Sequence, residues 1–71
     1  MRLRMKKREV REHVTRRARE LAESGRFERW SQIEFELRFK EGFPEARTVL
    51  GDDFIRDELD SICQRVRAKV N

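Results

Sequence analysis

Hydrophobic residues recur at intervals of three and four along most of this chain, which is the spacing of one face of a helix. Three segments show it: residues 5–23, 44–50 and 54–68. The apolar positions in them are Val10, Val14, Ala18, Leu21 and Ala22, then Ala46, Val49 and Leu50, then Ile55, Leu59, Ile62 and Val66, flanked by Phe54 and Cys63. Gly25 and Gly51 stand just after the first two segments, where glycine commonly ends a helix. The pattern therefore predicts a helix in each segment.

Residues 33–40, IEFELRFK, show a different pattern, because apolar and charged residues alternate there as in a half-buried strand. No other stretch alternates, so a strand would have no partner within the chain. Ser31 and Glu34 fit a capping box, the signature of a helix start, and Gly42 is placed to end a helix. We therefore predict a helix over 32–41. Its two sides are both apolar, with Ile33 and Leu37 on one and Phe35 and Phe39 on the other.

These elements predict an all-α fold, a small bundle of three to four helices at about 5–23, 32–41, 44–50 and 54–68. We expect residues 1–71 to form one small helical domain with a basic N-terminal arm. The first and last helices should pack about the second. A chain of 71 residues buries only about 60% of the surface of its unfolded state, so its margin of stability is thin. Association with a second subunit would widen that margin.

Charge is unevenly distributed in a chain whose residues are 45% charged and whose net charge is +4. Residues 1–20 hold nine Lys or Arg against three Glu, residues 21–63 hold six against eleven Asp or Glu, and residues 64–71 hold three and no acid. The basic arm indicates nucleic acid as a candidate partner, through phosphate contacts. The residues that would carry these contacts are Arg2, Arg4, Lys6, Lys7, Arg8 and Arg11. The alternative is a solvated helix face, partly neutralised by the acidic middle of the chain.

The sequence matches two DNA-binding motifs in part. Residues 32–50 give helix, turn and helix, but Arg38 stands where the two helices of a helix-turn-helix need a small residue, and Gly51 ends the second helix early. The sequence FELRF before a helical region resembles ribbon-helix-helix repressors, in which such strands pair across a dimer. Against that resemblance, a long helical segment precedes the stretch and only about seven helical residues follow it.

No set of residues indicates catalysis, a cofactor or a small-molecule substrate, so we expect a protein that is not an enzyme. His13 is the only histidine and Cys63 the only cysteine, too few to make a zinc site. The acidic group Asp52, Asp53, Asp57 and Glu58 suits the start of a helix better than a magnesium ion. The single cysteine and the absence of a long apolar run lead us to expect a cytoplasmic protein without membrane contact.

The aromatic residues in and just after the second helical segment are the favoured binding residues. Phe35, Phe39 and Phe43 are expected to dock on a partner protein or on a second copy of the chain, because so short a chain has little else to cover them. The primary hypothesis is therefore a small interaction or regulatory protein that uses this apolar helix face. The alternative is a small basic protein that binds nucleic acid through its N-terminal helix.

Overall fold

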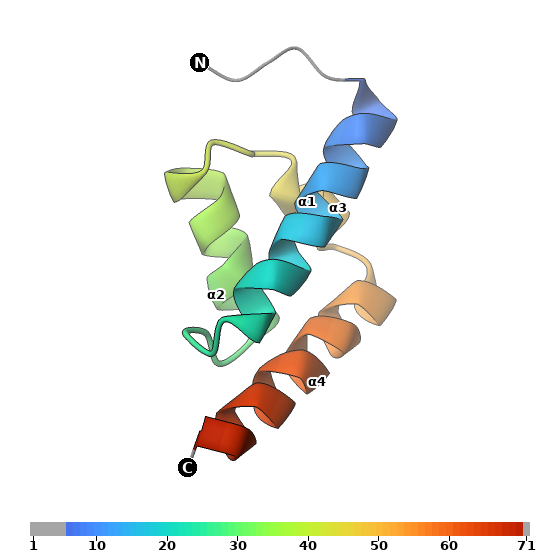
Figure 1. The fold of residues 1–71 in the computed structure, drawn as a ribbon. Coiled ribbons are helices and arrows are strands. Elements are labelled where there is room, and N and C mark those ends of the chain that lie inside the picture. Colours follow the sequence, from blue (N-terminus) through green and yellow to red (C-terminus); the bar gives the residue numbers. More distant parts are fainter. Residues whose placement is uncertain (1–5, 71) are drawn as a thin grey trace.

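The computed structural model describes residues 6–70, and every regular element in that range is helical (Figure 1). These are α1 (Lys7–Glu23), α2 (Trp30–Phe35), the π-helical turn η1 (Glu36–Lys40), α3 (Ala46–Val49) and α4 (Asp53–Val70). The predicted all-α bundle is confirmed. Residues 33–40 are helical, so the strand pairing of a ribbon-helix-helix protein does not apply to them. None of the described helices is both long and apolar enough to cross a membrane.

One hydrophobic core joins all the elements. Helices α1 and α4 pack together, α2 and α3 also pack against α1, and η1 continues from α2 and contacts α3 (Figure 1). The core residues are Val10, Val14, Ala18, Leu21, Ala22, Ile33, Leu37, Phe43, Ala46, Val49, Leu50, Ile55, Leu59, Ile62 and Cys63, with Phe27, Trp30 and Val66 packed against them. Almost every position of the predicted apolar stripes is therefore in the core. Phe54 is not, because it lies in the first turn of α4, where only its neighbour Ile55 is buried.

Helix α2 begins at Trp30 and not after Ser31, so the predicted capping box is wrong. The N-cap residue is Arg29, which has an extended backbone and makes no capping bond with its side chain. The cap comes from α4, where Asp60 Oδ1 accepts a hydrogen bond of 2.8 Å from the Trp30 backbone N–H. A carboxylate is well suited to the positive end of a helix. This contact fixes the start of α2 against α4.

The end of α2 is widened into the π-helical turn η1. The Glu41 backbone N–H bonds to the Glu36 carbonyl at 3.1 Å, five residues back, and the Phe43 N–H bonds to the Leu37 carbonyl at 2.9 Å. Gly42 follows with φ +77°, a left-handed conformation that glycine adopts without steric cost. The chain thus turns sharply after Glu41, as the position of Gly42 predicted, and returns Phe43 to the core.

Arg56 connects three elements at the turn between α3 and α4. Its Nε donates a hydrogen bond of 2.7 Å to the Leu50 carbonyl at the end of α3. Its guanidinium carbon lies 3.9 Å from the centre of the Trp30 ring, in the geometry of a cation–π contact. Asp53 Oδ1 is 4.0 Å from its Nη1. One side chain of α4 therefore holds both the end of α3 and the start of α2.

Candidate functional site

The continuous helix formed by α2 and η1 has two apolar faces, as the sequence predicted. Ile33 and Leu37 are fully buried in the core. Phe35 and Phe39 point away from it, and 57% and 62% of their surfaces are exposed. A helix needs only polar residues on its solvent side, and phenylalanine has a lower helix propensity than glutamate or lysine. The needs of the fold therefore do not explain aromatic rings at these two positions.

Phe35 and Phe39 form one contact surface, which we call the aromatic surface. Their ring centroids are 4.8 Å apart and the rings are tilted by 47°. The Arg38 guanidinium lies 4.8 Å from the centre of the Phe39 ring. Aromatic and arginine side chains are the types most enriched in the core of protein interfaces.

Two ion pairs border the aromatic surface. On one flank Arg38 donates a hydrogen bond of 3.1 Å to Glu34, and on the other Lys40 Nζ lies 3.8 Å from Glu36 Oε1. Both pairs are spaced four residues apart with the acid first, the order that stabilises a helix. The aromatic rings are thus framed by charges of both signs, which is the arrangement of an apolar centre with a polar rim.

A shallow hollow of about 510 Å³ adjoins Phe35. It is lined by Arg26, Phe27, Ser31, Gln32, Phe35, Glu36 and Lys40. The Arg26 guanidinium lies over the Phe27 ring at 5.2 Å. Sequence reasoning did not identify this hollow, because Arg26 and Phe27 precede the helix and reach it only through the turn at Gly25, whose φ is +81°. No local pattern around Phe27 indicated that contact.

Phe43 does not belong to the aromatic surface. Only 8% of it is exposed, and its ring lies 4.8 Å from the imidazole of His13 on α1. The left-handed Gly42 reverses the chain just before Phe43, so this residue enters the core while Phe39 stays outside. The structure therefore brings together two of the three predicted partner-binding residues and places the third among the residues that hold the fold.

The predicted nucleic-acid residues are only partly described. Lys6, Lys7, Arg8 and Arg11 are exposed, in and just before the first turns of α1, whereas Arg2 and Arg4 lie outside the described residues. A shallow groove of about 420 Å³ runs along α1 and is lined by Arg8, Arg11, Glu12, Thr15, Arg16 and Arg19. The basic residues near the end of α4, Arg65, Arg67 and Lys69, lie at the opposite end of the molecule from the start of α1 (Figure 1).

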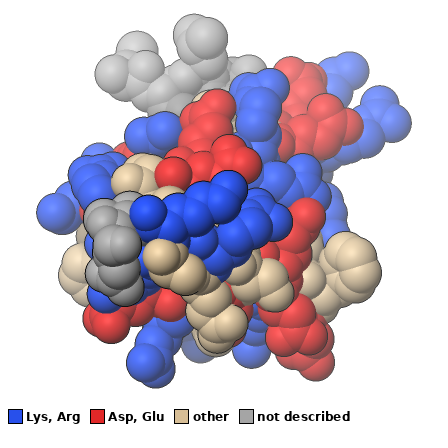
Figure 2. Space-filling model, turned by 60° about the horizontal axis from the view of Figure 1, so that its bottom comes forward, with Lys and Arg blue, Asp and Glu red and all other residues tan. Residues whose placement is uncertain are grey.

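Acidic residues of the middle of the chain pair with several of these arginines. Arg19 donates to Glu58 at 3.0 and 3.2 Å, and Arg11 Nη2 lies 3.9 Å from Asp52. Basic and acidic side chains are interspersed on the face that Figure 2 shows. The partial neutralisation that the charge distribution predicted is therefore present in the fold, and it reduces the charge that the groove offers to an anion.

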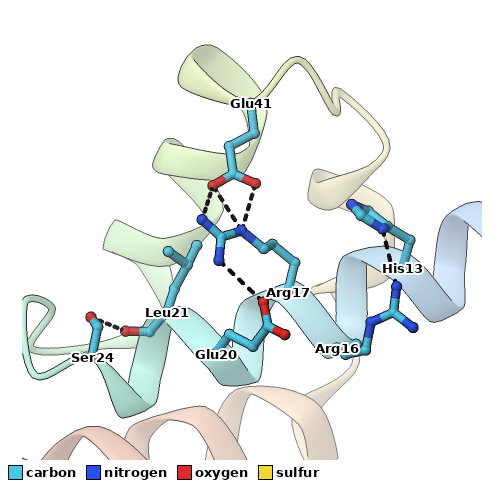
Figure 3. Close-up of polar contacts among 7 residues, drawn as sticks. All are labelled: His13, Arg16, Arg17, Glu20, Leu21, Ser24 and Glu41. Atoms are coloured by element: carbon cyan, nitrogen blue, oxygen red, sulfur yellow. Dashed lines mark hydrogen bonds and ion pairs between the residues drawn. The ribbon is translucent and has the colours of Figure 1, made fainter. Parts of the chain in front are cut away.

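Arg17 forms the most extensive of these ion pairs. Its guanidinium faces Glu41 at the end of η1, with Nε 3.0 Å from both carboxylate oxygens and Nη2 2.9 Å from one, and Nη1 donates to Glu20 at 3.1 Å (Figure 3). The hydrogen bonds to Glu41, then those to Glu20, raise the pKa of Arg17 above its usual value. Charge-assisted bonds of this kind fix geometry well. They anchor η1, and hence the aromatic surface, to α1.

The reactive residue types are occupied by structural contacts. The Arg16 guanidinium lies 3.5 Å from Nδ1 of His13 (Figure 3), whose ring also stacks against Phe43. Burial raises the pKa of the Cys63 thiol, which keeps it in the unreactive protonated form at neutral pH. Asp52 caps α4 by accepting a bond of 2.8 Å from the Phe54 N–H. No group of three or more His, Cys, Asp or Glu within the described range is arranged to hold a metal ion.

The fold and this surface together define a small all-helical protein with an exposed, charge-bordered aromatic pair. No known protein family, curated protein or solved structure matches the chain.

Proposed function

We propose that this chain is a small non-enzymatic interaction protein that binds a partner protein through Phe35 and Phe39. The observation that supports this is the two-faced helix, in which one face supplies the core and the other holds two adjoining exposed rings. Single exposed apolar residues are common on protein surfaces, whereas adjoining exposed aromatic rings with a polar rim have the composition of an interaction site. Phe54, which is 77% exposed in the first turn of α4, is an example of the common case.

Site-specific photo-cross-linking tests this proposal in the cells that naturally produce the protein. Phe39 is replaced by p-benzoylphenylalanine, which conserves the aromatic shape, and Gln64 on the exposed side of α4 carries the same probe as a control. We expect discrete protein adducts from position 39 and none from position 64. Adding Phe35→Ala should reduce the yield at least about fivefold, since truncating an energetically important interface residue costs more than about 1 kcal/mol. Phe54→Ala, the matched exposed phenylalanine, should leave the yield unchanged.

A different result would contradict the proposal. If position 39 gives no adduct, or if Phe54→Ala lowers the yield as much as Phe35→Ala, the aromatic surface is not a specific binding site. Circular dichroism of each variant shows whether it is folded, so that loss of binding is distinguished from loss of structure.

The groove on α1 favours a second candidate function, binding of nucleic acid. Its support is that Arg8, Arg11, Arg16 and Arg19 border one continuous groove. We expect a random-sequence DNA duplex to bind weakly, with an affinity that falls with salt at a log–log slope of about −4 if four phosphates are contacted. Fluorescence anisotropy at several salt concentrations measures this slope.

The matched variants for this test remove charge at opposite ends of the molecule. Replacing Lys6, Lys7, Arg8 and Arg11 by Gln should abolish DNA binding, whereas replacing Arg65, Arg67 and Lys69 by Gln should preserve most of it. Absence of binding at low salt, or equal losses from the two sets, would show that the groove is a solvated and internally paired helix face.

A further inference from the structure

We propose that the protein bound at the aromatic surface is a second copy of this chain, held with its α2–η1 helix antiparallel to that of the first. This inference rests on the proposed function and names the partner. It comes from the order of charges in residues 34–40, EFELRFK. Glu34, Phe35 and Glu36 precede the buried Leu37, and Arg38, Phe39 and Lys40 follow it. On each flank an acid is followed four residues later by a base, Glu34 by Arg38 and Glu36 by Lys40. Reversing the direction of the helix therefore exchanges Phe35 with Phe39 and, on each flank, exchanges the acid with the base.

A symmetric dimer pairs residue i of one copy with residue j of the other and, by symmetry, j with i. If the helices are antiparallel, Phe35 lies against Phe39 of the second copy. Each flank of one helix then faces the same flank of the second helix, which runs in the opposite direction. Glu36 then faces Lys40 of the second copy, and Glu34 faces Arg38 of the second copy. Each of these contacts occurs twice. The aromatic surface is therefore complementary to itself, because aromatic rings meet aromatic rings and acidic side chains meet basic ones.

The parallel arrangement of the same two helices is disfavoured by the same residues. A two-fold axis along the helices would place the Glu36 flank opposite the Glu34 flank of the second copy. Acid would then face acid, and Lys40 would face Arg38. Like charges across an interface select against an arrangement, so the flanking pairs specify orientation as well as contact. The intrachain pairs, Glu34 with Arg38 and Glu36 with Lys40, already hold these side chains beside the rings.

The hollow beside Phe35 has the position needed to receive a ring. In the antiparallel arrangement Phe39 of the second copy lies over Phe35, next to the hollow lined by Phe27 and Gln32. A phenylalanine side chain can bury roughly 200 Å², and Phe35 and Phe39 are 57% and 62% exposed. Covering these two rings in both copies would therefore bury about 480 Å² in total. This is well below the about 1,200 Å² at the lower limit of stable interfaces. The dimer is therefore expected to be weak, in exchange with monomer at micromolar concentration or above.

Sedimentation velocity of the full chain over micromolar to submillimolar concentrations tests the inference. The wild-type protein should show a reversible monomer–dimer equilibrium. Glu36→Lys should weaken it about tenfold or more, because two attractive pairs become repulsive. Combining Glu36→Lys with Lys40→Glu should restore it, since each flank is again complementary to itself. Glu23→Lys, a charge reversal at an exposed site on α1, should leave the equilibrium unchanged.

If Glu36→Lys strengthened association instead of weakening it, the two helices would be parallel. In a parallel dimer Glu36→Lys would face Glu34 of the second copy and would strengthen association. Strengthening, no change, or a wild-type chain that is monomeric throughout would each overturn the antiparallel dimer. In that last case an adduct between position 39 and another protein would leave the proposed function standing. Absence of any adduct would remove both proposals.

Discussion

Leu37→Ala is expected to destabilise the fold by about 2–5 kcal/mol, the cost of removing a fully buried leucine without refilling its site. Leu37 is completely inaccessible to solvent and lies in η1, where its carbonyl also accepts the Phe43 N–H bond. A chain of 71 residues has a total free energy of unfolding of about 4–10 kcal/mol. The variant should therefore be partly or largely unfolded at 37 °C. Thermal and urea unfolding, followed by circular dichroism, measure the change.

The control for Leu37→Ala is Phe39→Ala, two residues away on the same helix. It removes a larger side chain, but one that is mostly exposed, so we expect a change in unfolding free energy of less than about 1 kcal/mol. The two variants should separate stability from association, because the first is expected to weaken the fold and the second to weaken the binding proposed for the aromatic surface. Equal destabilisation by both would mean that Phe39 is packed in the folded protein, and the two-faced helix would be wrong.

This separation of the two faces would allow so small a chain both to fold and to bind the proposed partner. The inner face of α2 and η1 completes the core, and the ion pair of Arg17 with Glu41 fixes the end of η1 against α1. Phe35 and Phe39 are then presented on a supported helix, so little conformational entropy is lost when they bind. Preorganisation of this kind makes a small contact area more effective.

Much of the fold was predictable, because helical periodicity depends only on which positions along a segment are apolar. The same reasoning explains the success at residues 33–40. The alternation that imitated a strand reflects a helix with apolar residues on two sides. The glycines were also informative, since Gly25 and Gly42 both take the positive φ that their positions after a helix indicated.

The features that were missed depend on contacts between distant segments. The cap of α2 is supplied by Asp60, thirty residues away. Nothing in the local sequence 29–31 distinguishes a helix that begins at Trp30 from one that begins after Ser31. In sequence, Phe43 was grouped with Phe39 as a binding residue. The reversal of the chain at Gly42 buries Phe43 in the core and leaves Phe39 exposed to solvent. The hollow beside Phe35 likewise exists only because the turn at Gly25 brings Phe27 against the helix.

Arg56→Ala is the second variant for which we expect a large effect, about 2–3 kcal/mol of destabilisation. A hydrogen bond from a charged donor contributes about 1.5–3 kcal/mol, and a cation–π contact contributes about 0.5–2 kcal/mol. Arg56 makes both, to the Leu50 carbonyl and to the Trp30 ring, and we take the lower part of the combined range because its side chain is 34% exposed. Trp30 is the only tryptophan, so its fluorescence reports on the contact directly. Loss of the guanidinium should shift its emission to longer wavelength.

Arg56→Lys and Arg65→Ala distinguish the contacts of Arg56 from its charge. Lysine keeps the charge, but its single ammonium group does not bond to the Leu50 carbonyl and cover the Trp30 ring together, so we expect an intermediate stability. Arg65 is exposed on the same helix and makes neither contact, so its removal should change stability by no more than about 0.5 kcal/mol. If Arg56→Lys were as stable as the wild type, charge alone would account for the effect. If Arg56→Ala were also as stable, the contact of α4 with Trp30 would not help to hold the helix that carries Phe35 and Phe39.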